Sequence, residues 1–152
     1  MVTSWQQSDQ RPVNLPVSDL ISNSIILFFD GYCPFCTGII KILLKLDAHK
    51  KLRYSTIHSE TFQKATQQFK EIKKFDSVVV LKGDIFFIKS DAVFAIIDAL
   101  GGIWRILNVF RIIPRNIRKK LYDFIASRRK RWFGIRQTCY LPTPEEKKYF
   151  LS

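Results

Sequence analysis

Cysteine is scarce in this sequence, which contains three cysteines in 152 residues. This number is low and not even, which argues against a secreted domain held together by disulfides. The first twenty residues are polar and include Asp9 and Asp19, so they lack the apolar core of a secretory signal. We therefore expect a cytoplasmic protein, in a reducing compartment where a close pair of cysteines is more often catalytic or metal-binding than structural.

Long apolar runs are also missing. No segment approaches the roughly 18–20 uninterrupted apolar residues that a transmembrane helix requires. The longest candidate, residues 103–113, is interrupted by Arg105 and Arg111. No glycine-rich dinucleotide-binding motif is present either. The sequence thus predicts neither a membrane span nor a bound nicotinamide or flavin cofactor.

Apolar residues make up 47% of the chain, enough for one hydrophobic core in a domain of this length. The charge is distributed unevenly. Residues 1–100 hold twelve basic and ten acidic residues, a net charge of +2, whereas residues 101–152 hold thirteen and three, a net charge of +10. The C-terminal third therefore either presents a solvated cationic surface or attracts an anionic partner.

The order of the predicted elements indicates an α/β fold. Residues 24–29 form a continuous apolar run, typical of a strand buried on both faces, and residues 33–48 repeat apolar side chains at helical spacing. Further elements are expected in the order strand, helix, strand, strand, helix, at residues 52–57, 59–70, 76–81, 85–88 and 90–100. This order is that of a thioredoxin-like mixed four-stranded sheet flanked by helices.

Three regions follow from this pattern. Residues 1–23 have little apolar periodicity and are expected to form a flexible tail. Residues 24–102 form the thioredoxin-like core, which Gly101 and Gly102 close by ending its last helix. Residues 103–152 form a basic helical extension packed on that core and broken at Pro114.

A Cys-x-x-Cys motif follows the first predicted strand. Cys33 and Cys36 stand on the first turn of the next helix, where their sulfurs can close a disulfide. The N–H groups and the dipole of this helix favour a thiolate at Cys33. We expect Cys33 to attack a substrate disulfide and Cys36 to resolve the mixed disulfide. Pro34, which suits a first helical turn, and Phe35 would tune the reduction potential.

Two other interpretations of the pair stay open. The two cysteines can be small buried hydrophobic residues of the helix. They can also be zinc ligands, with Cys139, His49 and His58 as candidates for the further ligands that a four-coordinate site needs.

Residues 26–36 (ILFFDGYCPFC) resemble the signature of the DCC family of thiol–disulfide oxidoreductases. Further matches follow in order over residues 24–150: Ser90 to Ala92, Ile113 to Pro114, a Tyr-Ala-Arg-Phe-Gly pattern within residues 122–134, and Cys139 to Pro142. The resemblance implies a thioredoxin-like fold and disulfide reductase activity. Because no dinucleotide motif is present, we expect no cofactor, and electrons from another thiol such as glutathione or a thioredoxin-type donor.

Several residues near the pair are candidates for supporting roles. Asp30 either accepts a proton while Cys36 resolves the mixed disulfide or, with Gly31, holds the turn by bonding nearby N–H groups. Ser90 is expected to cap the helix that follows it, where it can also bond a thiolate. Cys139 is either a third redox thiol or an idle, packed cysteine.

The extension contains a basic cluster followed by two aromatic residues: Arg128, Arg129, Lys130, Arg131, Trp132 and Phe133. The cluster is either an exposed helix end or a site for an anionic partner, such as nucleic acid, a membrane surface or an acidic protein. Arg129 can also pair with a carboxylate inside the domain, Asp123 or Asp91. The alternative to a disulfide reductase is therefore a non-catalytic thioredoxin-like binding module.

Overall fold

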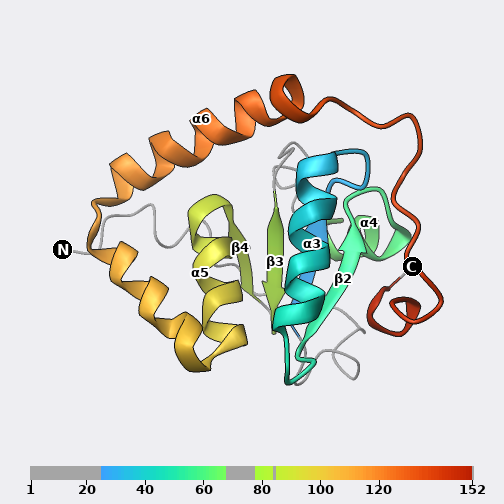
Figure 1. The fold of residues 1–152 in the computed structure, drawn as a ribbon, viewed down its shortest axis with the longest axis horizontal. Helices are drawn as coiled ribbons and strands as arrows, with labels where there is room; N and C mark the ends of the chain where they lie inside the picture. The colour runs from blue at the N-terminus through green and yellow to red at the C-terminus, as the bar shows by residue number, and fades with distance from the viewer. Residues whose placement is uncertain (1–24, 68–77, 84, 152) are drawn as a thin grey trace.

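The computed structural model describes residues 25–67, 78–83 and 85–151. Four strands form one mixed sheet in the order β2-β1-β3-β4 (Figure 1). β1 (Ile25–Phe29) runs parallel to β2 (Leu52–Thr56) and antiparallel to β3 (Val79–Lys82), which pairs antiparallel with β4 (Ile85–Ile88). The predicted α/β class, a mixed four-stranded sheet of the thioredoxin-like kind, is confirmed.

Helices cover both faces of the sheet. Alternate side chains of β1 point into two apolar clusters on opposite faces. One cluster is closed by α3 (Pro34–Leu46) and α5 (Lys89–Leu100), and the other by α4 (Glu60–Ala65). Every residue of β1 is therefore buried, which explains why this strand is an uninterrupted apolar run.

The helix α4 begins where the sequence predicts it and ends early. The Ser59 hydroxyl accepts a hydrogen bond from the Phe62 N–H at 3.1 Å and so caps its first turn. The helix ends at Ala65 rather than near residue 70. The predicted tail, residues 1–23, and the start of the predicted third strand, at residues 76–77, lie outside the described residues.

The predicted cap of α5 is wrong. Ser90 was expected at the N-cap, but α5 begins at Lys89, and Ile88 holds the N-cap position without a side-chain bond. The reason is that β4 leads directly into α5, and Lys89 makes the turn with a positive φ of 53°. Ser90 is therefore already in the helix, whereas a capping residue has an extended backbone.

Two further helical segments form the extension. η2 (Gly102–Ile112) is a 3₁₀ helix and α6 (Arg115–Phe133) is an α-helix, and the chain breaks between them at Pro114, as predicted. Figure 1 shows them as an arc around one side of the molecule. Both contact α5, and α6 also contacts α3.

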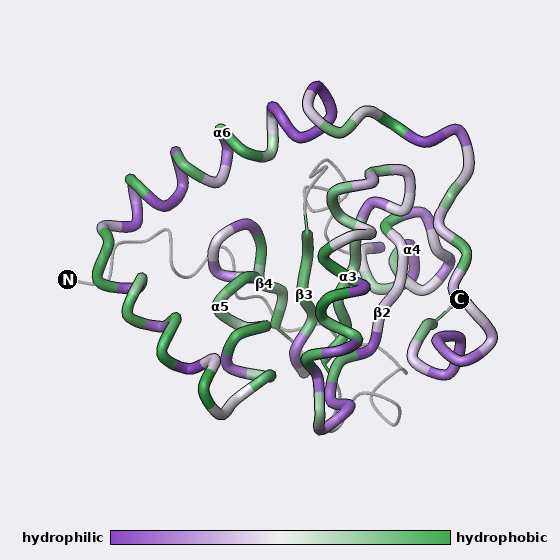
Figure 2. Tube along the Cα trace, viewed as in Figure 1, coloured by the Kyte–Doolittle hydropathy of each residue, from purple (hydrophilic) through white to green (hydrophobic). Residues whose placement is uncertain are grey.

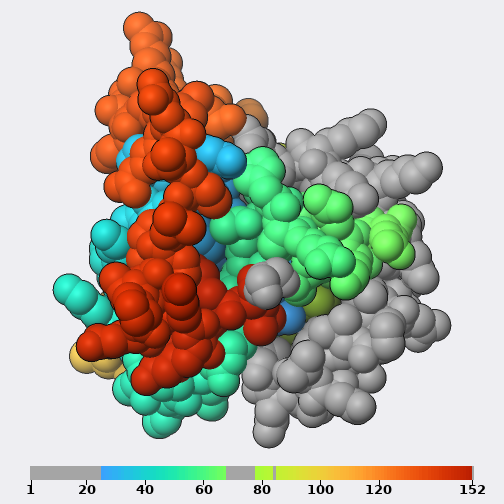
Figure 3. Space-filling model, turned by 90° about the vertical axis from the view of Figure 1, so that its right-hand side faces the viewer, coloured from blue at the N-terminus to red at the C-terminus, as the bar shows by residue number. Residues whose placement is uncertain are grey.

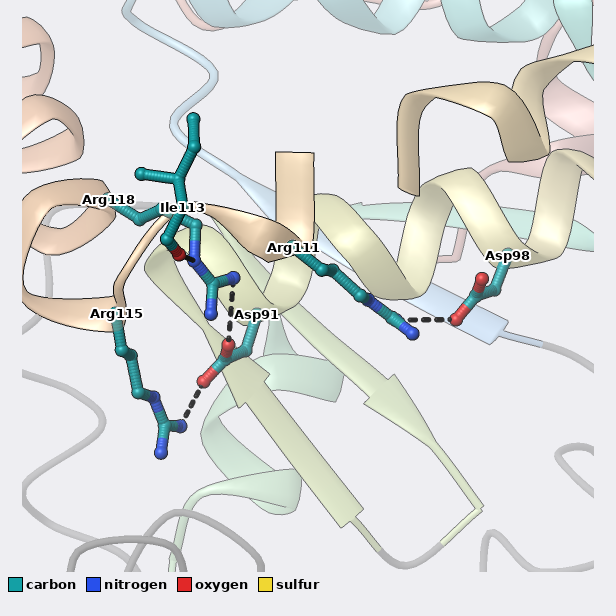
Figure 4. A network of polar contacts seen from close by, with 6 residues as sticks. All are labelled: Asp91, Asp98, Arg111, Ile113, Arg115 and Arg118. Atoms are coloured by element: carbon teal, nitrogen blue, oxygen red, sulfur yellow. Dashed lines mark hydrogen bonds and ion pairs between the residues drawn. The ribbon is translucent and has the colours of Figure 1, made fainter. Parts of the chain in front are cut away.

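Ion pairs fasten this arc to α5 (Figure 4). Arg111 of η2 binds Asp98 at 2.8 Å, and Arg115 of α6 binds Asp91. Arg118 lies 4.0 Å from Asp91 and donates to the Ile113 carbonyl at 3.1 Å. The two carboxylates of α5 thus pair with three arginines of the extension.

The C-terminal segment returns to the edge of the sheet beside β2. The Leu151 N–H donates to the Tyr54 carbonyl at 2.8 Å, and the Ser55 hydroxyl donates to the Leu151 carbonyl at 2.8 Å. Phe150 packs against the cluster of α3 and α5. Figure 3 shows this segment (red) spread over one side of the molecule, below the end of α6 (orange).

Candidate functional site

The two cysteines of the motif lie at the start of α3, directly after β1. Cys33 holds the N-cap position with an extended backbone, φ −89° and ψ 113°, and Pro34 opens the helix. The Thr37 N–H donates to the Cys33 carbonyl at 3.0 Å, which closes the first turn. The Cys33 side chain lies close enough to Cys36 to raise the pKa of its thiol. The pair therefore has the adjacency that reversible disulfide formation requires.

Asp30 organises the turn that precedes the pair. Its Oδ1 accepts a hydrogen bond from the Tyr32 N–H at 2.9 Å, and its carbonyl accepts one from the Cys33 N–H at 3.3 Å. The structural role considered for Asp30 is thus visible as a hydrogen bond. Its carboxylate is buried and close enough to act electrostatically on Cys36.

His58, which the sequence analysis considered only as a zinc ligand, is a neighbour of this turn. Its Nε2 lies 4.0 Å from Asp30 Oδ1, and its ring meets that of Tyr32 edge-on with centroids 5.3 Å apart. A signal existed: His58 follows β2 closely, and the carboxyl ends of parallel strands such as β1 and β2 meet at one edge of a sheet.

Arg129 is the main feature that the sequence reading missed. Its guanidinium, which comes from α6, donates from Nη1 to Cys36 Sγ at 3.1 Å. The side chain is 3% exposed. Tyr122, Ala126 and Arg129 are spaced for one face of α6, and this spacing was the available signal.

The buried position of Arg129 corrects the basic cluster predicted at residues 128–131. Arg129 points into the protein, so the cluster is not a continuous exposed patch. The carboxylates considered as its partners bind other cations, Asp123 at Lys89 and Asp91 at Arg115.

The electrostatics of Cys36 reflect two opposed effects. Burial raises the pKa of Cys36 to about 12, and the Arg129 guanidinium opposes the rise by favouring the thiolate. Cys33 and Asp30 add smaller contributions that raise this pKa. Cys36 is thus held as a thiol, next to a cation positioned to stabilise negative charge when it forms on the sulfur.

Both sulfurs are buried, and residues of α6 lie beside the pair. Cys33 is 1% exposed and Cys36 2% exposed. Next to them, the ring of Phe35 packs against that of Phe133 at the end of α6, with centroids 5.1 Å apart.

The C-terminal segment brings Cys139 to the same turn. The Arg136 N–H donates to the Tyr32 carbonyl at 2.8 Å, and the Tyr140 N–H donates to the Gly31 carbonyl at 3.0 Å. Cys139 Sγ is packed so closely that a Cβ at Gly31 would lie 2.4 Å from it. Burial raises the pKa of Cys139. This packing explains why glycine suits position 31.

A model of the DCC1-like thiol-disulfide oxidoreductase family matches residues 27–135. The chain belongs to this family. The matched residues of the DCC1-like protein run from β1 to just beyond α6, so they include Cys33, Cys36 and Arg129. Cys139 lies beyond them. Family membership supports a thiol–disulfide redox role.

Two relatives are similar over most of their length. An uncharacterised Bacillus subtilis (strain 168) protein, YuxK, is 34% identical over 135 residues, which cover 88% of this chain and 98% of YuxK. A chloroplastic DCC family protein of Arabidopsis thaliana is 30% identical over 141 residues, covering 91% of this chain and 74% of the relative. No solved structure matches the chain significantly.

Three further findings concern Ser90, metal binding and membrane spans, and all three apply to the described residues only. Ser90 lies in the first turn of α5 and makes no hydrogen bond to a cysteine there. Across residues 25–67, 78–83 and 85–151, no three His, Cys, Asp or Glu side chains are grouped to hold a metal ion. No helix in this part of the chain is long and apolar enough to span a bilayer.

Proposed function

We propose that this DCC1-like protein is a disulfide reductase that uses Cys33 and Cys36 as its redox pair. The observation that carries the proposal is the adjacency of the two thiols at the start of α3, with the Arg129 cation on Cys36. Two inert core cysteines would not need a buried guanidinium beside one sulfur, since burying a cation is costly.

The reaction would proceed by two exchanges. The Cys33 thiolate attacks one sulfur of a substrate disulfide, which forms a Cys33–substrate mixed disulfide and releases the other substrate sulfur as a thiolate. Cys36 then loses its proton and attacks Cys33 Sγ, which releases the second substrate thiol and leaves the Cys33–Cys36 disulfide. Two electrons have then passed from the protein to the substrate.

Arg129 and Asp30 would support the second exchange. Cys36 has a raised pKa and must become a thiolate to attack. Arg129 Nη1 would stabilise that thiolate, and the Asp30 carboxylate would accept the proton. Pro34 and Phe35, between the cysteines, would tune the potential. Cys139 would be either a third exchanging thiol or a packing residue against Gly31.

No cofactor is required in this scheme. Two molecules of glutathione, or one dithiol of a thioredoxin-type protein, would reduce the Cys33–Cys36 disulfide in two further exchanges and leave as the corresponding disulfide. The substrates would be protein or small-molecule disulfides. A reducing compartment such as the cytoplasm would keep the pair in its dithiol form.

The test is the reduction potential of the pair, measured by equilibrating the full chain in glutathione and dithiothreitol buffers and trapping the thiols. We expect one two-electron transition near about −270 to −200 mV, the range of cellular reductants. Cys33→Ser and Cys36→Ser should abolish both the transition and the reduction of glutathione disulfide. Cys139→Ser should retain the transition. Absence of a Cys33–Cys36 disulfide in every buffer would overturn the proposal.

A further inference from the structure

The outer face of η2 carries a row of exposed aliphatic side chains. A 3₁₀ helix has three residues per turn, so residues 103, 106, 109 and 112 lie one above another. These residues are Ile103, Ile106, Val109 and Ile112, which are 78%, 71%, 55% and 81% exposed. Trp104, on another face of η2, packs toward the core instead. A row of four aliphatic side chains in water is unusual and marks an interaction surface.

The helix α6 carries a second apolar row. Its inner face includes Arg129, the only buried residue of the helix. Outside, Ile117, Leu121, Phe124 and Trp132 are spaced for one helical face, and each is between 47% and 56% exposed. None of these four side chains belongs to either apolar core cluster.

Cations accompany both rows. Three arginines of the extension, Arg111, Arg115 and Arg118, pair with Asp98 or Asp91 of α5 (Figure 4). Five exposed cations of η2 and α6 form no ion pair with the described residues: Arg105, Lys119, Lys120, Arg128 and Arg131. Figure 2 shows hydrophobic and hydrophilic residues alternating along both segments of the arc. The extension thus combines outward apolar side chains with outward positive charge.

We propose that η2 and α6 form a peripheral docking surface for anionic lipid bilayers. Apolar side chains that insert at the headgroup boundary, beside cations that bind anionic headgroups, are the design of interfacial helices. No described helix is long and apolar enough to span the bilayer, so the contact is peripheral. The surface would hold the domain at a membrane in both the dithiol and the disulfide form of Cys33 and Cys36.

A bilayer explains the residue types better than nucleic acid does. Single-stranded nucleic acid is bound by aromatic side chains that stack on bases between the cations. Six of the eight side chains in the two rows are isoleucine, valine or leucine, which offer no stacking surface, and the other two are Phe124 and Trp132. Aliphatic side chains gain free energy by leaving water for a lipid phase, which needs no shape complementarity.

Co-sedimentation of the full chain with large unilamellar vesicles tests the proposal. We expect binding to vesicles of phosphatidylcholine with phosphatidylserine, and far weaker binding to phosphatidylcholine alone. Lys119→Gln with Lys120→Gln should lower the partition coefficient by about fivefold for each lysine removed. Ile106→Ser with Ile112→Ser should lower it by at least about a hundredfold, since two isoleucine side chains no longer move from water into the lipid.

The matched control lies on α3, outside the extension. Ile42 is 57% exposed, and Lys45 is an exposed cation on the same helix, so Ile42→Ser with Lys45→Gln removes the same chemistry from another face. This variant should bind vesicles like the unaltered chain. Failure of the unaltered, folded chain to bind anionic vesicles would overturn the proposal. Equal losses in the control variant, or binding of a single-stranded oligonucleotide in place of vesicles, would also overturn it.

Discussion

Arg129 Nη1 lies 3.1 Å from Cys36 Sγ, so a cation from the last long helix touches the second cysteine of the motif. The contact joins α6 to the start of α3 and places positive charge at a sulfur whose pKa burial raises to about 12. A buried cation next to a buried thiol has its largest effect when the thiol ionises, because the low local dielectric strengthens the attraction. We therefore assign Arg129 to the resolving step of the proposed reaction.

Replacing Arg129 with methionine should slow resolution and leave the first exchange intact. Arg129→Met removes the charge at similar length, so the pKa of Cys36 should rise further and its thiolate should become rarer. Hydrogen bonds to charged groups contribute about 1.5–3 kcal/mol, which corresponds to roughly 10- to 100-fold in rate. Rapid mixing with an aromatic disulfide, acid quenching and mass spectrometry would measure the lifetime of the Cys33 mixed disulfide.

The control for this experiment is Lys45→Met, which removes an exposed cation from α3 far from any assigned role. Its mixed disulfide should resolve at the rate of the unaltered chain. A resolution rate that is the same in Arg129→Met and Lys45→Met would contradict the role of Arg129.

Substitution of Gly31 should destabilise the fold through Cys139. An alanine Cβ at position 31 would lie 2.4 Å from Cys139 Sγ and 3.2 Å from Thr56 Cγ2, so the C-terminal segment would have to shift. Overpacking of this kind typically costs about 1–3 kcal/mol. Gly31→Ala should therefore unfold at a lower denaturant concentration, and adding Cys139→Ala should restore part of the loss.

Chemical denaturation of the unaltered chain, the two single variants and the double variant gives the coupling energy between positions 31 and 139. Gly38→Ala is the matched control, because nothing lies within 4 Å of its added Cβ and position 38 is inside α3. There alanine should be neutral or stabilising, by about 0.5–1 kcal/mol. Additive effects of Gly31→Ala and Cys139→Ala would show that their contact does not carry the destabilisation.

Glu146 should make the C-terminal segment sensitive to acid. Its Oε2 accepts hydrogen bonds from the Tyr140 hydroxyl at 2.7 Å and from the Thr143 N–H at 2.9 Å. Burial acts to raise the pKa of Glu146, but these bonds outweigh it and hold the pKa below its ordinary value of 4.5. The ionised carboxylate thus adds stability above pH 4.5, and this stability is lost as the pH falls through the folded-state pKa.

Glu146→Gln should therefore melt below the unaltered chain at neutral pH, by about 2–4 °C if the charge contributes about 1 kcal/mol. The difference should shrink as the pH falls through the lowered folded-state pKa of Glu146, because the native carboxyl then becomes neutral as well. Thermal melts between neutral and acidic pH measure this difference in melting temperature. Glu145→Gln, at an exposed neighbouring position, is the control. A melting difference that does not change with pH would contradict an electrostatic origin.

The local chain encodes the elements that carry the redox pair. The apolar run of β1, the Pro34 that opens α3, the Ser59 cap of α4 and the break at Pro114 each act within a few residues. Backbone preference and capping are short-range effects, so a sequence reading finds them. The predicted Ser90 cap failed because the residue at the N-cap position depends on where the preceding strand ends.

Tertiary packing alone decided which side chains surround the sulfurs. Arg129 reaches Cys36 across 93 positions of sequence, and Cys139 closes on Gly31 from beyond the end of α6. Such contacts depend on the position of α6 and of the chain after it, which many weak interactions set together, including the ion pairs at Asp91 and Asp98. The motif determined where the redox pair lies in the chain. Only the folded structure determined that Arg129 contacts Cys36 and that Phe133 packs beside the pair.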